Sequence, residues 1–324
     1  MVVFSTKIDV TFQSISIIIL FDELVGRCIY MKKFQVLTDS TSDVVKEIRE
    51  EFELDYVRML FTQDGVERNA DLDWGEINPK TYYDQMRKGS RSVTGLATFG
   101  EFQEKFRKYL EQGMDILFIG CSTRLSGTVN NAKLVAAELL TEFPDRRIIC
   151  FDSLRTNYAE GLMAIDAAKM ALDGKELDEV VNYLEDNCLN YQVHATVDTL
   201  QFLKLAGRIK ASTAFFGNLF GVKPIIVSDA KGNNYGYKKV KGRKNSLNEL
   251  VNIVKTRMIN PKESILFIEH ADSLEDAEYV AKELEGFVKE IKISWLGPII
   301  GATIGPGAIT CNFYGEKVDF ASEE

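Results

Sequence analysis

The sequence predicts an α/β protein of two domains. The first is an αβα domain around a mainly parallel sheet, and the second is an α+β domain whose sheet is partly antiparallel. The chain has 324 residues, 45% of them hydrophobic, which is enough to fill a core in each domain. Strand and helix patterns alternate singly up to residue 151, as in βαβ units around a parallel sheet. Beyond residue 190 their order becomes irregular, as in α+β domains.

The first thirty residues differ from the rest. Their apolar run, residues 14–21, is far shorter than the ~20 residues that a membrane-spanning helix needs, and no signal-peptide cleavage site follows it. Strand-like sequence begins directly after Met31, which we expect to be the true start. We therefore expect residues 1–30 to be an extension outside the fold. A packed extension and a weak membrane-surface segment are the alternatives.

The N-terminal domain is expected to span residues 31–174, with a small β excursion at about residues 55–75. Asp39-Ser-Thr-Ser-Asp43 offers N-cap side chains to a helix, and Pro79 suits the first turn of another. The predicted strands are residues 34–38, 54–60, 115–121 and 147–151, and the predicted helices are residues 44–51, 79–89, 99–112 and 126–142.

Gly174 marks the expected boundary, because glycine can end a helix in a left-handed conformation. The C-terminal domain then spans residues 175–318. A helix is predicted just before the boundary, at residues 158–172. The helices predicted after it are residues 177–188, 199–205, 211–220, 246–258 and 274–285. The predicted strands are residues 192–197, 224–228, 233–240, 265–269, 288–295 and 308–314.

Composition excludes several classes of function. A net charge of −9 is unfavourable for binding nucleic acid, so we expect no such partner. The five cysteines form no C-x-x-C pair, which fits a reducing compartment, and we expect a cytoplasmic protein. The two histidines, His194 and His270, lack zinc-ligand spacing, so we expect neither a metal nor a cofactor.

Residues 116–128 predict an anion-binding turn. An apolar strand runs into Ser, Thr and Gly just where a helix begins, so backbone N–H groups and hydroxyls converge outside the sheet edge. A carboxylate or a phosphate fits such a place. Ser126 or Thr128 would alternatively act as an ordinary helix N-cap with no ligand.

Several motifs in this order resemble the DegV family of bacterial lipid-binding proteins, over about residues 33–314. They are Thr38-Asp-Ser-Thr-Ser-Asp43, Leu125-Ser-Gly-Thr128, Val197-Asp-Thr-Leu-Gln-Phe-Leu-Lys-Leu-Ala-Gly-Arg-Ile209, Leu219–Ile226 with Lys223-Pro224, and Gly297-Pro-Ile-Ile-Gly-Ala-Thr-Ile-Gly-Pro-Gly-Ala308.

The resemblance implies a non-catalytic carrier that binds a long-chain fatty acid. The carboxylate would lie between the domains and the tail inside the C-terminal one, and some relatives present the acid to a fatty acid kinase. By position, the carboxylate-binding residues would be Thr94, Gly95, Ser126, Gly127 and Arg208.

The chain departs from the family pattern at two places. Relatives often have Thr-Ser-Gln-Pro-Ser at residues 94–98, where this chain has Thr-Gly-Leu-Ala-Thr. Thr303 stands where relatives commonly have histidine, and threonine can hydrogen-bond a carboxylate but adds no positive charge. This departure bears on delivery to a kinase more than on lipid binding.

Three further hypotheses remain open. The anion-binding turn at residues 116–128 would serve an acyl- or phosphoryl-transfer enzyme if Cys121 or Ser126 were a nucleophile and His270 its base. Residues 200–205 and 214–220 would line a lipid tunnel or belong to the plain core. The basic stretch at residues 231–244 would form a lysine-protected edge strand, or contact an acidic partner or, transiently, an anionic membrane surface.

Overall fold

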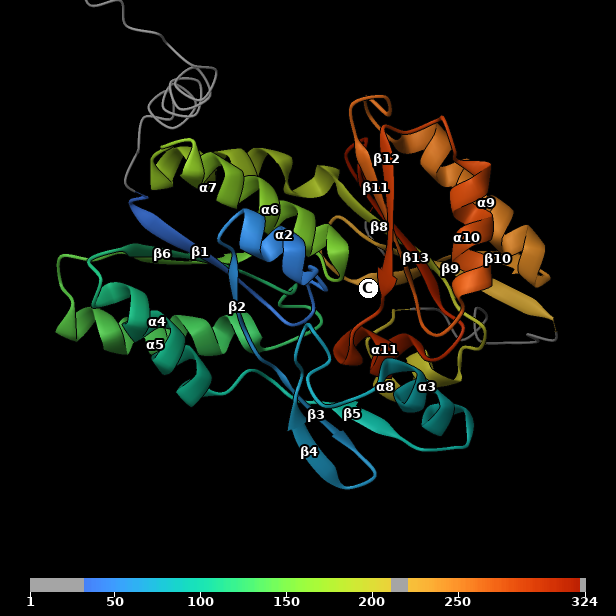
Figure 1. Ribbon diagram of the computed structural model, residues 1–324, viewed down its shortest axis with the longest axis horizontal. Helices are drawn as coiled ribbons and strands as arrows, with labels where there is room; N and C mark the ends of the chain where they lie inside the picture. Colours follow the sequence, from blue (N-terminus) through green and yellow to red (C-terminus); the bar gives the residue numbers. More distant parts are fainter. Residues whose placement is uncertain (1–31, 211–220, 321–324) are drawn as a thin grey trace, which may run out of the picture.

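The computed structural model describes residues 32–210 and 221–320. The expected extension at residues 1–30 and the helix expected at residues 211–220, with its proposed tunnel-lining residues, lie outside the described residues. The described chain folds into two large sheets and one small one. Figure 1 shows the two large sheets next to each other, with helices around them.

The first large sheet is parallel throughout, with the strand order β2-β1-β6-β7. Its strands are β1 (Phe34–Asp39), β2 (Asp55–Val57), β6 (Asp115–Gly120) and β7 (Ile148–Asp152). The helices of this half are α2 (Lys46–Glu51), α4 (Phe99–Leu110), α5 (Thr128–Glu142), α6 (Tyr158–Leu172) and α7 (Leu177–Asn187). The predicted αβα arrangement is confirmed.

Strand β6 is buried on both faces because helices cover both faces of this sheet. Phe118 makes edge-to-face ring contact with Phe102 of α4 at 5.1 Å. Its neighbours Leu117 and Ile119 point to the opposite face and share a core with α6 and α7. The carboxyl ends of β1 and β6 therefore meet at one edge, where their loops face the second large sheet.

The second large sheet is mixed, with the strand order β10-β9-β8-β13-β11-β12. Only β11 and β12 pair in parallel, so the predicted partly antiparallel sheet is confirmed. Its strands are β8 (Tyr191–Thr196), β9 (Val222–Ser228), β10 (Asn234–Lys241), β11 (Ile265–His270), β12 (Glu290–Trp295) and β13 (Ile309–Tyr314). Helices α9 (Arg243–Arg257) and α10 (Leu274–Glu283) cover one face, and a short 3₁₀ turn (Cys188–Asn190) precedes β8.

Helix α6 connects the two large sheets physically. It packs on β1 of the first sheet and on β8 and β13 of the second. At its start, the Tyr158 ring stacks on Phe267 of β11, with ring centroids 4.0 Å apart. Gly174, which follows this helix, adopts the predicted left-handed conformation with φ 78°.

A small antiparallel sheet projects below the large ones, with the order β4-β3-β5 (Figure 1). Its strands are β3 (Leu60–Gln63), β4 (Val66–Asn69) and β5 (Ser92–Thr94), and beside it lie α3 (Pro79–Arg87), α8 (Gln201–Ala206) and α11 (Pro298–Ile304). The strand predicted at residues 54–60 is thus two strands in two different sheets. Strand β5 and helix α11 were not predicted.

One predicted helix start is confirmed and one is wrong. Asn78 caps α3 by accepting a hydrogen bond from the Thr81 N–H at 3.0 Å, and Pro79 occupies the first turn. The residue that caps α2 is Val45, which offers no side-chain hydrogen bond. The polar residues at 39–43 instead turn into the protein, where their side chains bond one another.

Within residues 32–210 and 221–320, no helix combines the length and the apolar composition that crossing a membrane requires. The basic stretch predicted as an edge strand contains β10, which pairs only with β9 among the described strands. Lys238 of this strand forms an ion pair with Glu249 of α9 at 2.8 Å. Contact of this edge with a membrane or an acidic partner stays a prediction.

Candidate functional site

A narrow cavity of about 80 Å³ lies where the loops after β1 and β6 face the second large sheet. Its walls are mostly apolar and come from β8, β9, α8, α11 and the loop after β5. The apolar lining residues are Met59, Leu96, Leu125, Val193, Ala195, Leu203, Ile226, Val227, Ile299, Ile300 and Ile304. A larger groove of about 1180 Å³ adjoins it and shares Thr94, Arg208 and Thr303 with it.

Five of the six predicted head-group residues line this cavity. They come from segments far apart in sequence: Thr94 ends β5 of the small sheet and Gly95 follows it, Ser126 precedes α5, Arg208 follows α8, and Thr303 is on α11. The sixth, Gly127, is not among the lining residues, although a Cβ atom placed on it would come within 3.3 Å of Leu96.

Ser126 has local partners as well as access to the cavity. Its Oγ lies 2.9 Å from Thr128 Oγ1 and accepts a hydrogen bond from the Thr128 N–H at 3.3 Å. The capping position of α5 is Gly127, which has no side chain to accept from the helix N–H groups. The hydroxyl of Ser126 therefore closes a tight turn before the helix. It can still donate or accept a further hydrogen bond on the side that faces the cavity.

Gly95 cannot donate its backbone N–H to a ligand. That N–H donates to the carbonyl oxygen of Leu60 at 2.7 Å, continuing the pairing of β3 with β5. A Cβ atom at position 95 would approach Leu60 Cβ to 3.1 Å, so a small residue is favoured there. The expected role of Gly95 as a head-group donor is corrected to one in backbone packing.

Thr94, Thr303 and Arg208 mark the boundary between the cavity and the groove. Thr303 Oγ1 donates to the Ile299 carbonyl oxygen at 3.2 Å and keeps its lone pairs available. Arg208 is exposed, and its Nη1 donates to the Ala206 carbonyl oxygen at 2.5 Å. The guanidinium therefore lies at the mouth, where it faces water as well as the cavity.

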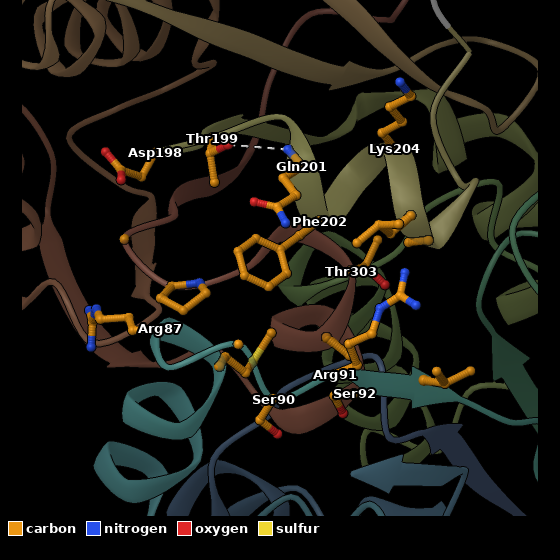
Figure 2. Close-up of a pocket in the computed structure, with 18 of the residues that line it drawn as sticks. Arg87, Ser90, Arg91, Ser92, Asp198, Thr199, Gln201, Phe202, Lys204 and Thr303 are labelled. Atoms are coloured by element: carbon orange, nitrogen blue, oxygen red, sulfur yellow. Dashed lines mark hydrogen bonds between the residues drawn. The ribbon is translucent and has the colours of Figure 1, made fainter. Parts of the chain in front are cut away.

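Figure 2 shows the groove, with Phe202 at the centre of the drawn side chains, between Thr303 on one side and Asp198 and Thr199 on the other. Phe202 follows Gln201, whose N–H donates to Thr199 Oγ1 at 3.2 Å. Cations outnumber anions along the groove. The lining cations are Arg87, Lys88, Arg91, Lys204, Arg208 and Arg243, and the lining anions are Asp198 and Asp276.

The geometry does not favour nucleophilic catalysis by Cys121. The thiol lines the cavity but is 2% exposed, and burial, together with Glu160 and Asp39, raises its pKa well above the usual range. A thiol held in its protonated form is a poor nucleophile. His270 is not among the described lining residues, and its Nδ1 accepts from the Ser273 N–H at 3.4 Å while its ring packs on Trp295. Burial lowers the pKa of His270.

Four buried carboxyl groups beside the cavity were missed by the sequence reasoning: Asp39, Asp43, Glu160 and Glu269. The sequence carries a signal for two of them. Glu160 interrupts the otherwise small and apolar inner face of α6, and Glu269 ends the apolar run of β11. An acidic residue within a buried pattern indicates a specific partner, because an isolated buried charge is costly.

Fold and cavity together define an α/β protein whose two large sheets border an apolar cavity that opens beside hydroxyl groups. The model of the DegV family of uncharacterised proteins matches residues 33–316, and the chain belongs to this family. A DegV domain-containing protein of Clostridium perfringens is 35% identical over 288 residues, which cover 88% of this chain and 99% of that protein. One of Clostridium acetobutylicum is 28% identical, covering 86% and 98%.

Solved structures of the family share the fold. A fatty-acid-binding DegV family protein from Thermus thermophilus is 26% identical with a TM-score of 0.78, covering 88% of this chain and all of that chain at 100%. A DegV lipid-binding protein from Thermotoga maritima is 24% identical with a TM-score of 0.77, covering 89% and 100%. Both resemblances extend over the two large sheets.

Proposed function

We propose that this chain is a non-catalytic carrier of a long-chain fatty acid. The observation that carries the proposal is the apolar cavity whose mouth brings together Thr94, Ser126, Thr303 and Arg208. The carboxylate would accept hydrogen bonds from the Thr94 and Ser126 hydroxyls, and from Thr303 if its hydroxyl turns away from the Ile299 carbonyl oxygen, and it would lie near the Arg208 guanidinium. The tail would lie against β8 and β9 of the second large sheet. The binding of fatty acid by the Thermus thermophilus relative supports this assignment.

The tail dominates the expected affinity. Burying a sixteen-carbon chain at about 0.8 kcal/mol per methylene gives an upper bound of about 12 kcal/mol, whereas each hydrogen bond to a charged head group contributes about 1.5–3 kcal/mol. The polar residues at the mouth would therefore set the direction in which the chain enters. Because Arg208 is exposed, its attraction for the carboxylate is screened by water.

The cavity must widen to hold such a chain. An apolar cavity of about 150 Å³ holds one benzene molecule, and this one has about 80 Å³. Binding therefore requires apolar side chains of α8 and α11 to move apart from the sheet. Short helices are suited to such movement, since α8 has six residues and α11 seven.

The absence of catalysis and the delivery of the acid to a fatty acid kinase are further parts of the proposal. Two observations support a carrier over an enzyme: the thiol of Cys121 is held protonated, and His270 lies outside the lining of the cavity. The cation-rich groove beside the mouth offers a surface for a partner that acts on the head group. The cytoplasm is the proposed location, because the scattered cysteines without a C-x-x-C pair fit a reducing compartment.

Solvent extraction tests the proposed function. Protein purified from bacteria is extracted, and the extract is analysed by mass spectrometry. We expect one fatty acid per chain in the wild type and less in Ala195→Phe, which places a ring in the cavity beside Ile226. Leu134→Phe on the exposed face of α5 is the matched control and should retain the lipid. A wild-type extract without fatty acid, or with equal amounts in all three proteins, contradicts the proposal.

A further inference from the structure

Four carboxyl groups lie buried at the contact between the two large sheets. Asp39 ends β1 and Asp43 follows it, Glu160 is in the first turn of α6, and Glu269 is in β11. Asp39, Glu160 and Glu269 are 0% exposed and Asp43 is 5% exposed. Four negative charges at such close quarters would repel strongly in a region without water.

The hydrogen bonds of Thr41 show that the Asp39–Glu160 pair holds a proton. Thr41 Oγ1 lies 2.6 Å from Asp39 Oδ1 and 2.6 Å from Glu160 Oε2. A hydroxyl has one proton and can donate to only one of two carboxylate oxygens. The other oxygen must therefore carry a proton of its own and donate it to the hydroxyl.

The remaining bonds indicate which member carries that proton. Asp39 also accepts from the backbone N–H groups of Thr41 at 2.8 Å and of Cys121 at 3.0 Å, which favours its charged form. Glu160 accepts from Thr38 Oγ1 at 2.9 Å and from the Asp39 backbone, yet burial still raises its pKa well above the usual range. Glu160 is thus the acid that donates to Thr41, and Thr41 donates to Asp39.

The second pair, Asp43 and Glu269, joins the two sheets directly. Asp43 Oδ1 and Glu269 Oε1 are both buried without a hydrogen-bond donor among the described residues, and each group shifts the pKa of the other. A proton shared between two such oxygens would satisfy both of them. Glu269 Oε2 accepts from Thr310 Oγ1 at 3.1 Å and from Asn312 Nδ2 at 3.0 Å. The proton of this pair therefore lies between Asp43 Oδ1 and Glu269 Oε1, the two oxygens that lack another donor.

The surroundings offer no positive charge to replace these protons. The titratable neighbours from other elements are Cys121 after β6, Tyr83 of α3, Tyr158 of α6 and Arg49 of α2. Burial raises the pKa values of the thiol and of both phenols, so these groups stay neutral. Arg49 bonds the Asp73 carboxylate at 2.6 Å. No lysine or arginine of the described chain is among the groups that shift the four carboxyl pKa values.

We propose that the shared protons of these two pairs keep the two large sheets together beside the cavity, with Asp43–Glu269 across the contact and Asp39–Glu160 on its β1–α6 side, so that loss of the protons opens the contact. Thr41, which bonds the first pair, and Asn157 and Thr310, which bond the second, also line the cavity. Asn157 Nδ2 donates to Asp43 Oδ2 at 3.3 Å, and Thr310 Oγ1, which donates to Glu269 Oε2, lies 3.3 Å from Asn157 Oδ1. The further consequence, that alkaline pH releases the lipid, rests on the proposed function.

The sign of the pH dependence follows from burial. Burial is the main cause that raises the pKa of all four groups, to about 8 for Asp43. In the unfolded chain these groups lose their protons near pH 4, so the folded state binds more protons above that pH and stability falls as pH rises. For one proton with a folded pKa of about 8, the ratio of folded to unfolded protein falls about tenfold between pH 7 and pH 9.

Infrared spectroscopy of the full chain in heavy water tests the proton assignment without any variant. Protonated carboxyl groups have a carbonyl band distinct from that of carboxylates. We expect this band at neutral pH, weakening as the pH is raised to 9. A spectrum at neutral pH without the band overturns the proposal.

Urea unfolding between pH 7 and pH 9 tests whether the two carboxyl pairs, here called the clamp, stabilise the contact between the sheets. Asp43→Asn is the variant. Asparagine keeps the shape of Asp43, tolerates its positive φ of 51°, and cannot ionise. We expect the ratio of folded to unfolded wild type to fall about tenfold across this range. The same ratio should fall clearly less in the variant. Glu185→Gln, an exposed change on α7, should follow the wild type. Equal slopes for wild type and Asp43→Asn overturn the proposal, as does a dependence on added divalent cations at constant pH, which would assign a metal ion in place of the proton.

Retention of bound fatty acid is measured on the same samples. We expect faster release at pH 9 than at pH 7 in the wild type and a smaller change in Asp43→Asn. If no fatty acid is bound at any pH, the proposed function fails while the infrared and unfolding results still decide the clamp. If fatty acid is bound and its release is the same at both pH values, the link between clamp and cavity fails.

Discussion

Replacing Ser126 by alanine removes one hydroxyl from the mouth of the cavity. The Ser126 Oγ is held 2.9 Å from Thr128 Oγ1, so it is oriented by the protein itself. A hydrogen bond to a carboxylate contributes about 1.5–3 kcal/mol, which corresponds to about a 10- to 150-fold loss of affinity. Most of the affinity remains, because the buried tail contributes up to about 12 kcal/mol.

Ser122→Ala is the matched control for this change. Ser122 lies in the same loop, and its Oγ donates to the Gly232 carbonyl oxygen at 2.8 Å, but it does not line the cavity. Its loss should lower the free energy of unfolding by about 1 kcal/mol and leave affinity unchanged. Displacement of a fluorescent fatty acid measures the affinity, and urea unfolding measures the stability. Equal affinities for Ser126→Ala and Ser122→Ala would refute the assignment of the Ser126 hydroxyl to the head group.

Three further predictions follow from the structure. Cys121 should react with iodoacetamide at neutral pH far more slowly than the unfolded chain does, because burial raises its pKa; labelling at a comparable rate would contradict this, as read by mass spectrometry. Thr303→His should bind fatty acid at least as tightly as the wild type if position 303 faces the head group. A larger dissociation constant, measured by displacement of a fluorescent fatty acid, would place the head group elsewhere. Tyr83→Phe should lower the free energy of unfolding by about 1–3 kcal/mol, since the buried Leu296 carbonyl oxygen would lose the donor that lies 2.6 Å away; an unchanged urea midpoint would rule this out.

The order of strands and helices could be predicted because local pattern and tertiary packing agree over most of the chain. Residues 54–60 show where they do not. The apolar run looks continuous in sequence, but the chain leaves the first sheet after Val57 and enters the small sheet at Leu60. Helix α11 was missed because four of its seven residues are β-branched, which are weak helix formers, and its stability comes from packing against α8 and β5.

The hydroxyl and guanidinium residues of the candidate site could be predicted from their motifs, but their bonding could not. Gly95 shows the limit: nothing in the sequence says that its N–H already pairs with Leu60. The proton-sharing pairs show another, since Asp43 and Glu269 are 226 residues apart and meet only when the sheets pack together. Long-range pairing of this kind leaves no local pattern.

A crystal structure with a fatty acid that carries bromine on its terminal carbon tests the central claim most directly, because anomalous scattering locates the far end of the chain. We expect the bromine against β8 and β9, near Val193 and Ile226, with the carboxylate within hydrogen-bond distance of Ser126. Bromine in the cation-rich groove, with the carboxylate buried or absent, would contradict the account.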